Sequence, residues 1–169
     1  MGGRSGGRAG SALTKAPFFA RRRAQAAVDD AHARYDAGDT EAAWRALESA
    51  LKDDPACVEA EFLLGRIAND RKQYAVAAEH LKRAAELKPK DAATYGELAR
   101  AFHELHNRRE AEVAYARALE LGNDPYIAIN FATFLRDTGR FDEATRFYRR
   151  AVEAPGLDAE TRERIRQML

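Results

Sequence analysis

The sequence predicts an all-α chain built from stacked helix–turn–helix units. Three observations lead to this prediction: a long repeat, helical spacing of apolar residues inside each repeat, and residues that break helices between them. A small anchor residue recurs at steps of 34, 34 and 33, as Ala43, Ala77, Ala111 and Ala144. Periods of this length are typical of proteins in which neighbouring units stack to bury a continuous core.

Each repeat has two further apolar positions after its first anchor. Four residues on stands a larger side chain, and three residues later comes a second alanine. These positions hold Leu47, Leu81, Tyr115 and Tyr148, and then Ala50, Ala84, Ala118 and Ala151. Spacings of four and three place all three positions on one face of a helix.

A second helix precedes each anchor helix from the second repeat onward. The stretches EAEFLLGRIANDRK, ATYGELARAFHELH and YIAINFATFLRDTG align, and each places a large residue directly before a small one. These pairs are Leu64 and Gly65, Leu98 and Ala99, and Phe131 and Ala132. The small residue allows two helices to approach closely, and its large neighbour fills the space beside it.

Breaks separate the helices at matched points. The two helices of each repeat are parted at Gly38-Asp39, Lys72-Gln73, His106-Asn107 and Gly139-Arg140. Glycine and asparagine suit a left-handed helix end. Pro55 and Pro89 end the second helices of their repeats.

This pattern resembles the tetratricopeptide repeat family over residues 24–157. FLLGRIA matches the family's first helix, and AAEHLKRAAELKP and EATRFYRRA match its second. The resemblance implies a right-handed solenoid of four repeats that acts as a non-catalytic protein-interaction adaptor. The chain departs from the family at its early tryptophan position, which reads Ala27, Glu61, Tyr95 and Ala128. The first repeat is the weakest, with Asp30 where the others hold Leu or Phe.

Three segments follow from this pattern. Residues 1–16 are rich in Gly and Arg, and we expect a disordered basic tail because they hold too little apolar surface to order themselves. Residues 17–157 form the predicted solenoid, whose first helix has Pro17 in its first turn and ends at Gly38. Residues 158–169 form a predicted capping helix that begins at Asp158.

Three aromatic residues near the N-terminus require a surface against which to pack. Phe18 and Phe19 lie at the start of the first helix, and Trp44 stands where later repeats have small or polar residues. We predict that they form a hydrophobic lid over repeat one. The alternative is an exposed aromatic docking patch.

The composition gives little sign of chemistry. The net charge is +1, Cys57 is the only cysteine, and no run of about 18 apolar residues could span a membrane. The HELH stretch does not have the H-E-x-x-H spacing of zinc peptidases, and no phosphate-binding glycine loop is present. We expect no catalytic residue, no metal, no cofactor and no small-molecule substrate.

The resemblance places the first helices on a concave face, where aligned positions form columns. The first column is mainly apolar, with Val28, Phe62 and Ile129 and a gap at Gly96. The second column is largely basic and consists of His32, Arg66, Arg100 and Thr133. The third column is acidic and consists of Asp36, Asp70, Glu104 and Asp137. Asn69, His103 and Asn130 complete the predicted peptide-binding groove. We expect an apolar side chain of a partner to enter the room at Gly96, and an acid to meet the arginines. The competing interpretation is that Arg66–Asp70 and Arg100–Glu104 are surface pairs of little energetic weight.

One mechanism of the family is excluded. Chaperone-binding members clamp a carboxylate with a Lys/Asn/Asn/Lys/Arg set, and the matching positions here are Val28, His32, Leu63, Ala93 and Glu97.

We therefore expect a protein or peptide partner, and a chain that is monomeric or part of a larger assembly. Two alternatives remain open. The first 28 residues carry six basic residues and no acid, which favours nucleic acid or anionic membrane as a second target. The second alternative is that the chain is an adaptor subunit of a secretion or envelope assembly. We expect a cytoplasmic location, with organellar import through the basic N-terminus left open.

Overall fold

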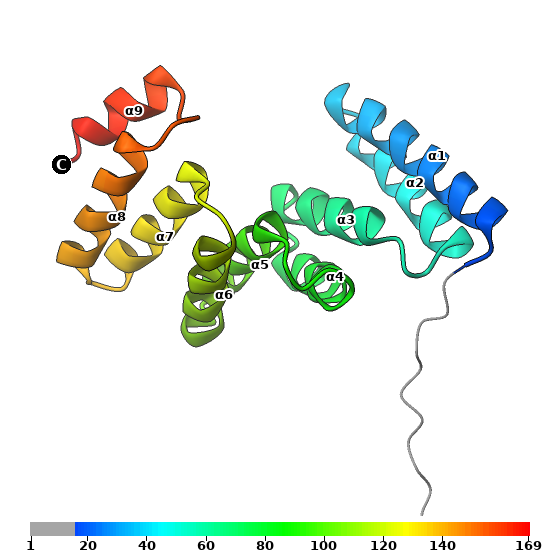
Figure 1. Ribbon diagram of the computed structural model, residues 1–169, viewed down its shortest axis with the longest axis horizontal. Coiled ribbons are helices and arrows are strands. Elements are labelled where there is room, and N and C mark those ends of the chain that lie inside the picture. The colour runs from blue at the N-terminus through cyan, green and yellow to red at the C-terminus, as the bar shows by residue number, and fades with distance from the viewer. Residues whose placement is uncertain (1–15) are drawn as a thin grey trace, which may run out of the picture. The chain divides into compact units, whose positions relative to one another are not determined.

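The computed structural model describes residues 16–169, so the predicted tail lies outside the described residues except for Ala16. That range holds nine α-helices and no strand. The helices are α1 (Phe18–Asp36), α2 (Thr40–Asp53), α3 (Val58–Asp70), α4 (Tyr74–Leu87), α5 (Ala92–Glu104), α6 (Arg108–Leu121), α7 (Pro125–Asp137), α8 (Phe141–Glu153) and α9 (Ala159–Arg166) (Figure 1). The prediction of an all-α chain of four helix–turn–helix repeats followed by a C-terminal helix is confirmed.

The chain divides into two compact units between Cys57 and Val58. The first unit contains the hairpin of α1 and α2. The second contains α3 to α9, in which α3 packs on α4, α5 on α6 and α7 on α8. Within this second unit the first helices of successive repeats also contact each other, α3 with α5 and α5 with α7.

The turn between the two helices has the same conformation in every repeat. Gly38 and Gly139 have φ of +82°, and Lys72 and His106 have φ of +59°. The left-handed residue is therefore the first of each predicted pair, and in repeat three it is His106 and not Asn107. A non-glycine residue tolerates this conformation at some cost, which glycine avoids in repeats one and four.

The predicted anchors form the core. Ala43, Ala77 and Ala111 have no exposed surface, and Ala144 is also buried. The larger residue between the anchors is buried in all four repeats. Gly65 is placed tightly, because a Cβ atom there would lie 2.4 Å from Cγ of Leu81.

The C-terminal helix is shorter than predicted. Helix α9 begins after Asp158, whose carboxylate accepts a hydrogen bond from the backbone N–H of Thr161 at 2.8 Å. Leu157 and Ile165 are buried. Met168 and Leu169 follow the end of the helix and are exposed.

Candidate functional site

The first helices of the second unit carry the groove positions that lie together. A cavity of about 310 Å³ opens between α5 and α7. Its lining residues are Arg100, His103, Glu104 and His106, then Tyr115 of α6, and Asn130, Thr133 and Asp137 of α7. Four of the ten predicted groove residues thus line one cavity: Arg100, His103, Asn130 and Thr133.

Arg100 is held by carboxylates on two helices. Its Nη2 lies 2.8 Å from Oδ1 of Asp70 on α3, and its Nη1 lies 3.6 Å from Oε2 of Glu97 on α5. Burial by itself lowers the pKa of Arg100, but the hydrogen bond to Asp70 and the nearby negative charges raise it above its ordinary value. Arg100 therefore stays cationic, and its nearest carboxylate belongs to Asp70 of the preceding repeat, whereas the competing interpretation paired it with Glu104.

Negative charge dominates around this cavity. Glu104 and Asp137 line it, and the two carboxylates beside Arg100 already offset that cation. Burial and the neighbouring Glu104 raise the pKa of the Tyr74 hydroxyl, which hydrogen-bonds to that carboxylate. Around this cavity the four carboxylates of Asp70, Glu97, Glu104 and Asp137 thus outnumber the guanidinium groups of Arg100 and Arg136.

Two side chains on α7 supply hydrogen-bonding groups. Thr133 Oγ1 donates to the carbonyl of Ile129 at 3.0 Å, and the Tyr148 hydroxyl, also 3.0 Å away, can donate to it. Asn130 is exposed on the same helix. An amide side chain both donates and accepts, so Asn130 matches the peptide groups of an extended chain.

His103 stands between the charged and aromatic parts of the cavity. Its Nε2 lies 3.4 Å from Oδ2 of Asp137, and its ring meets the Phe134 ring edge-on at 5.3 Å. The His103 imidazole thus packs against the Phe134 ring and lies beside the Asp137 carboxylate. Within residues 16–169 there is no group of three or more His, Cys, Asp or Glu side chains that could hold a metal ion.

The remaining groove residues lie elsewhere. Phe62 lines a separate cavity of about 310 Å³ with Lys88 and Asp91. Asn69 is buried and donates hydrogen bonds to the backbone carbonyl and the carboxylate of Glu97, at 3.0 and 2.8 Å. It therefore joins α3 to α5. Arg66 and Ile129 are partly exposed on α3 and α7.

The predicted apolar column does not offer the expected pocket. Val28, in the first unit, has no exposed surface, so it has nothing to present to a ligand. The room predicted at Gly96 is filled, because a Cβ atom there would lie 2.9 Å from Cδ1 of Ile127. This prediction was wrong because the repeat pattern does not show which side chain of the next repeat fills a gap. His32 belongs to the first unit and is partly exposed.

The three aromatic residues of the predicted lid are not brought together. In the first unit, Arg23 Nη2 pairs with Asp53 Oδ1 at 2.6 Å, so the start of α1 lies beside the end of α2. Trp44 is at the other end of α2, where its Nε1 donates to Glu48 at 3.1 Å. At about 1.5 Å per residue, Trp44 is roughly 20 Å from the Phe18–Phe19 pair along the hairpin. The lid was wrong because two antiparallel helices put these positions at opposite ends.

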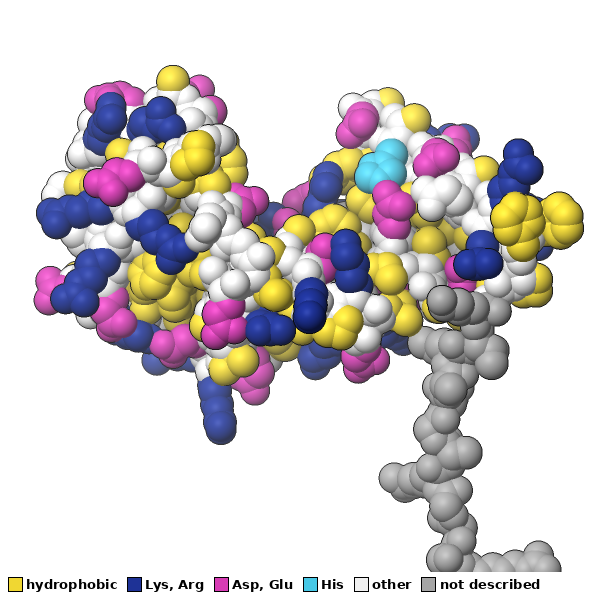
Figure 2. Space-filling view, in the orientation of Figure 1, with side chains coloured by type: hydrophobic (Ala, Val, Ile, Leu, Met, Phe, Trp, Pro, Cys, Tyr) yellow, Lys and Arg dark blue, Asp and Glu magenta, His cyan; other side chains and the backbone are white. Residues whose placement is uncertain are grey.

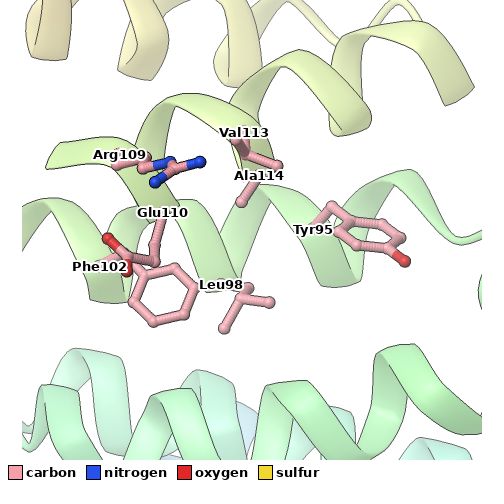
Figure 3. Close-up of a pocket in the computed structure, with 7 residues that line it drawn as sticks. All are labelled: Tyr95, Leu98, Phe102, Arg109, Glu110, Val113 and Ala114. Carbon is pink, nitrogen blue, oxygen red and sulfur yellow. The ribbon is translucent and has the colours of Figure 1, made fainter. Parts of the chain in front are cut away.

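A third cavity, which sequence reasoning missed, lies on α5 and α6 (Figure 3). It measures about 320 Å³ and is lined by Tyr95, Leu98, Phe102, Arg109, Glu110, Val113 and Ala114. The Nζ of Lys82 lies 5.3 Å from the centre of the Phe102 ring. The repeat pattern assigns such apolar residues to packing, and no spacing in the sequence separates a filled contact from an open one. The available signal in the sequence was Val113, an apolar residue two positions after the anchor Ala111 and therefore off the core face of the helix.

Comparison with known proteins agrees with the repeat fold. Tetratricopeptide repeat models match residues 28–92 and 126–155. The chain belongs to the tetratricopeptide repeat family. Arrays of this family are generally non-catalytic scaffolds for protein–protein interaction, so the family implies protein partners for this chain. In residues 16–169, moreover, no helix has the length and apolarity needed to cross a bilayer.

Solved structures show the same fold. A crystal structure of MamA is 26% identical, with a TM-score of 0.67, and the match covers 72% of each chain. MamA from Desulfovibrio magneticus RS-1 is 19% identical, with a TM-score of 0.72 and coverage of 77% of this chain and 74% of that one. PilF of Pseudomonas aeruginosa is 20% identical, with a TM-score of 0.71 and coverage of 82% and 64%. A comparison with curated proteins gave no match.

Proposed function

We propose that this chain is an adaptor whose second unit binds a segment of a partner protein across α3, α5 and α7. The segment presents a basic side chain to the cavity between α5 and α7. The observation that carries this proposal is the lining of that cavity. It includes the carboxylates of Glu104 and Asp137. It also includes hydrogen-bonding side chains at four groove positions predicted from the sequence, Arg100, His103, Asn130 and Thr133.

The sign of the ligand charge follows from the balance around Arg100. The sequence suggested an acidic ligand, because Arg100 was expected to be only weakly paired. In the structure Asp70 and Glu97 contact Arg100, while Glu104 and Asp137 line the cavity wall, where Asp137 also lies 3.5 Å from Nε of Arg136. A carboxylate entering here would meet like charges, whereas a lysine or arginine would gain a partner.

Contacts to the ligand backbone complete the recognition. Asn130 is exposed on α7 and has both donor and acceptor atoms. It lines the same cavity as Asp137, which lies seven residues later and so about two turns along one face. A backbone contact at Asn130 and a charge contact at Asp137 together favour an extended segment over an isolated side chain.

Selection from a peptide library tests this proposal, because it does not require a named partner. The purified full chain would be panned against random peptides displayed on phage, and the enriched peptides would be synthesised. We expect enrichment of lysine and arginine. Affinity, measured by fluorescence anisotropy, should fall on the order of tenfold for Asp137→Lys and for Asn130→Ala.

The matched control is Val113→Glu, which adds a charge at an exposed residue of the α5–α6 cavity. It should bind the selected peptides as the wild type does. Enrichment of acidic peptides would contradict the proposed ligand charge. Peptides whose binding depends on Val113 but not on Asp137 would move the interface to the α5–α6 cavity. Circular dichroism melting of each variant separates loss of binding from loss of fold.

A further inference from the structure

The start of α1 carries an exposed aromatic pair beside exposed arginines. Phe18 and Phe19 are 64% and 72% exposed, and Arg21 and Arg22 follow them directly. Figure 2 shows hydrophobic and basic side chains adjoining at the end of the first unit where α1 begins. We call Phe18, Phe19, Arg21 and Arg22 the aromatic–arginine patch.

The patch is continuous because of helical spacing. Arg21 and Arg22 stand three and four residues after Phe18, and Arg22 stands three after Phe19. Residues at these separations are neighbours on a helix surface. The third arginine, Arg23, is turned to the hairpin, where it pairs with Asp53. The patch therefore joins an apolar tip to two positive charges on one surface.

The charges on this helix oppose its own stability. Helix α1 has no acidic residue in its first turn, and Pro17 before it makes no side-chain capping hydrogen bond. The positive end of the helix dipole disfavours arginines at this end. Helix α8 offers the contrast, since it also begins with an exposed phenylalanine but follows it with Asp142 and Glu143. A local arrangement that costs stability points to a use outside the fold.

We infer that the aromatic–arginine patch binds the surface of an anionic lipid bilayer. Phe18 and Phe19 enter the boundary between headgroups and acyl chains, and Arg21 and Arg22 pair with lipid phosphates. An apolar tip beside basic residues is the combination that holds peripheral proteins at such a surface. Each basic residue near an anionic leaflet adds to the attraction.

The geometry of the two rings favours lipid over nucleic acid. Their centroids are 5.5 Å apart and their planes lie at 75°, so the rings pack edge to face. They form a compact apolar knob instead of a pair of open, parallel platforms on which successive bases stack.

Vesicle flotation tests the inference on the full chain. The protein should float with vesicles of phosphatidylglycerol and phosphatidylcholine in equal amounts, and remain below vesicles of phosphatidylcholine alone. Phe18→Ala/Phe19→Ala should abolish flotation. Arg21→Gln/Arg22→Gln should weaken binding on the order of tenfold. All four residues are exposed, so the variants should melt at the wild-type temperature.

Two matched controls separate this patch from general surface properties. Phe141 is 65% exposed at the start of α8, so Phe141→Ala removes an equally exposed ring from an acidic setting. Arg108→Gln/Arg109→Gln removes two exposed arginines from the first turn of α6. Both controls should float as the wild type does.

Three results would overturn the inference. The first is no flotation of the wild type with anionic vesicles. The second is unchanged flotation of Phe18→Ala/Phe19→Ala, or equal losses from the control variants. The third is binding of a labelled single-stranded oligonucleotide that depends on Arg21 and Arg22 but not on the phenylalanines, which would assign the patch to nucleic acid. Peptide binding by the second unit should be unchanged in all patch variants.

Discussion

Nδ1 of His80 lies 2.6 Å from Oε2 of Glu61 and joins α4 to α3 inside repeat two. The Glu61 side chain is only 5% exposed, and its other oxygen lies 3.7 Å from Nη1 of Arg83. Glu61 occupies the position where the family has tryptophan. A buried carboxylate is destabilising unless it is paired and hydrogen-bonded, so this repeat depends on His80.

His80→Leu should lower the free energy of unfolding by about 1–3 kcal/mol, because it leaves the Glu61 carboxylate buried without its nearest partner. Urea denaturation followed by circular dichroism measures this. The double variant Glu61→Leu/His80→Leu should be more stable than His80→Leu alone, since an apolar pair leaves no buried charge. If the single and double variants lose stability equally, the hydrogen bond does not support the repeat.

Gly65→Ala should destabilise the second unit, although the matching residues of repeats three and four are alanines. The new Cβ atom would lie 2.4 Å from Cγ of Leu81, and Leu81 is fully buried and has no room to move. Overpacking of this kind costs about 1–3 kcal/mol, measurable in the same urea experiment. The opposite change at the matching position, Ala99→Gly, should cost about 1 kcal/mol through helix propensity and about 1 kcal/mol more through the loss of a buried methyl group. Equal stability of Gly65→Ala and the wild type would contradict the close contact.

Ala111→Leu should disturb the packing of α5 on α6, because Ala111 has no exposed surface. We expect a loss of about 1–3 kcal/mol and a fall in Tm of roughly 2–12 °C. Ala116→Leu is the matched control, since Ala116 is exposed on the same helix. Differential scanning calorimetry of both proteins decides the matter. Similar Tm values would mean that this face of α6 is not in the core.

Asp158 should make the docking of α9 sensitive to pH, with the docking lost in acid. Hydrogen bonds from the backbone and hydroxyl of Thr161 and from the Tyr126 hydroxyl lower the pKa of Asp158 to about 2. A lowered pKa means that the stabilisation is complete above the ordinary aspartate pKa of about 4 and is lost as the pH falls towards 2. Amide exchange of Thr161, followed by NMR, should therefore quicken relative to the intrinsic rate across this range.

Two variants check the cause of that dependence. Asp158→Asn keeps a capping oxygen but has no proton to gain. Amide exchange of Thr161, relative to its intrinsic rate, should therefore stay constant in this variant between about pH 4 and about pH 2. Tyr126→Phe removes the hydroxyl that lies 2.8 Å from the Asp158 carboxylate, so the pKa should rise and the loss should begin at higher pH. Unchanged behaviour of Asp158→Asn would assign the acid effect to another group.

Much of the fold was predictable because it rests on spacing along single helices. The alanine anchors and the larger residues between them recur at fixed steps, and all of them are buried. The start of α9 followed from Asp158 in the same local way. Helical periodicity, caps and breakers act over a few residues, so one sequence is enough to detect them.

The candidate site was less predictable because its residues come from different helices. Arg100, His103, Asn130 and Thr133, which the alignment of columns grouped, line one cavity, and peptide binding there stays a prediction. It could not show that Asp70 from the preceding repeat would engage Arg100. Charge balance in a groove depends on which side chains meet across repeats.

The sequence by itself thus determined the number of repeats, the positions of their core residues and the family. The tertiary structure alone decided that Ile127 fills the space at Gly96, that Trp44 lies far from Phe18, and that an apolar cavity opens on α5 and α6. The physical reason is that periodicity fixes the direction of a side chain on its own helix. What that side chain meets depends on the shape and rotamer of residues that are distant along the chain.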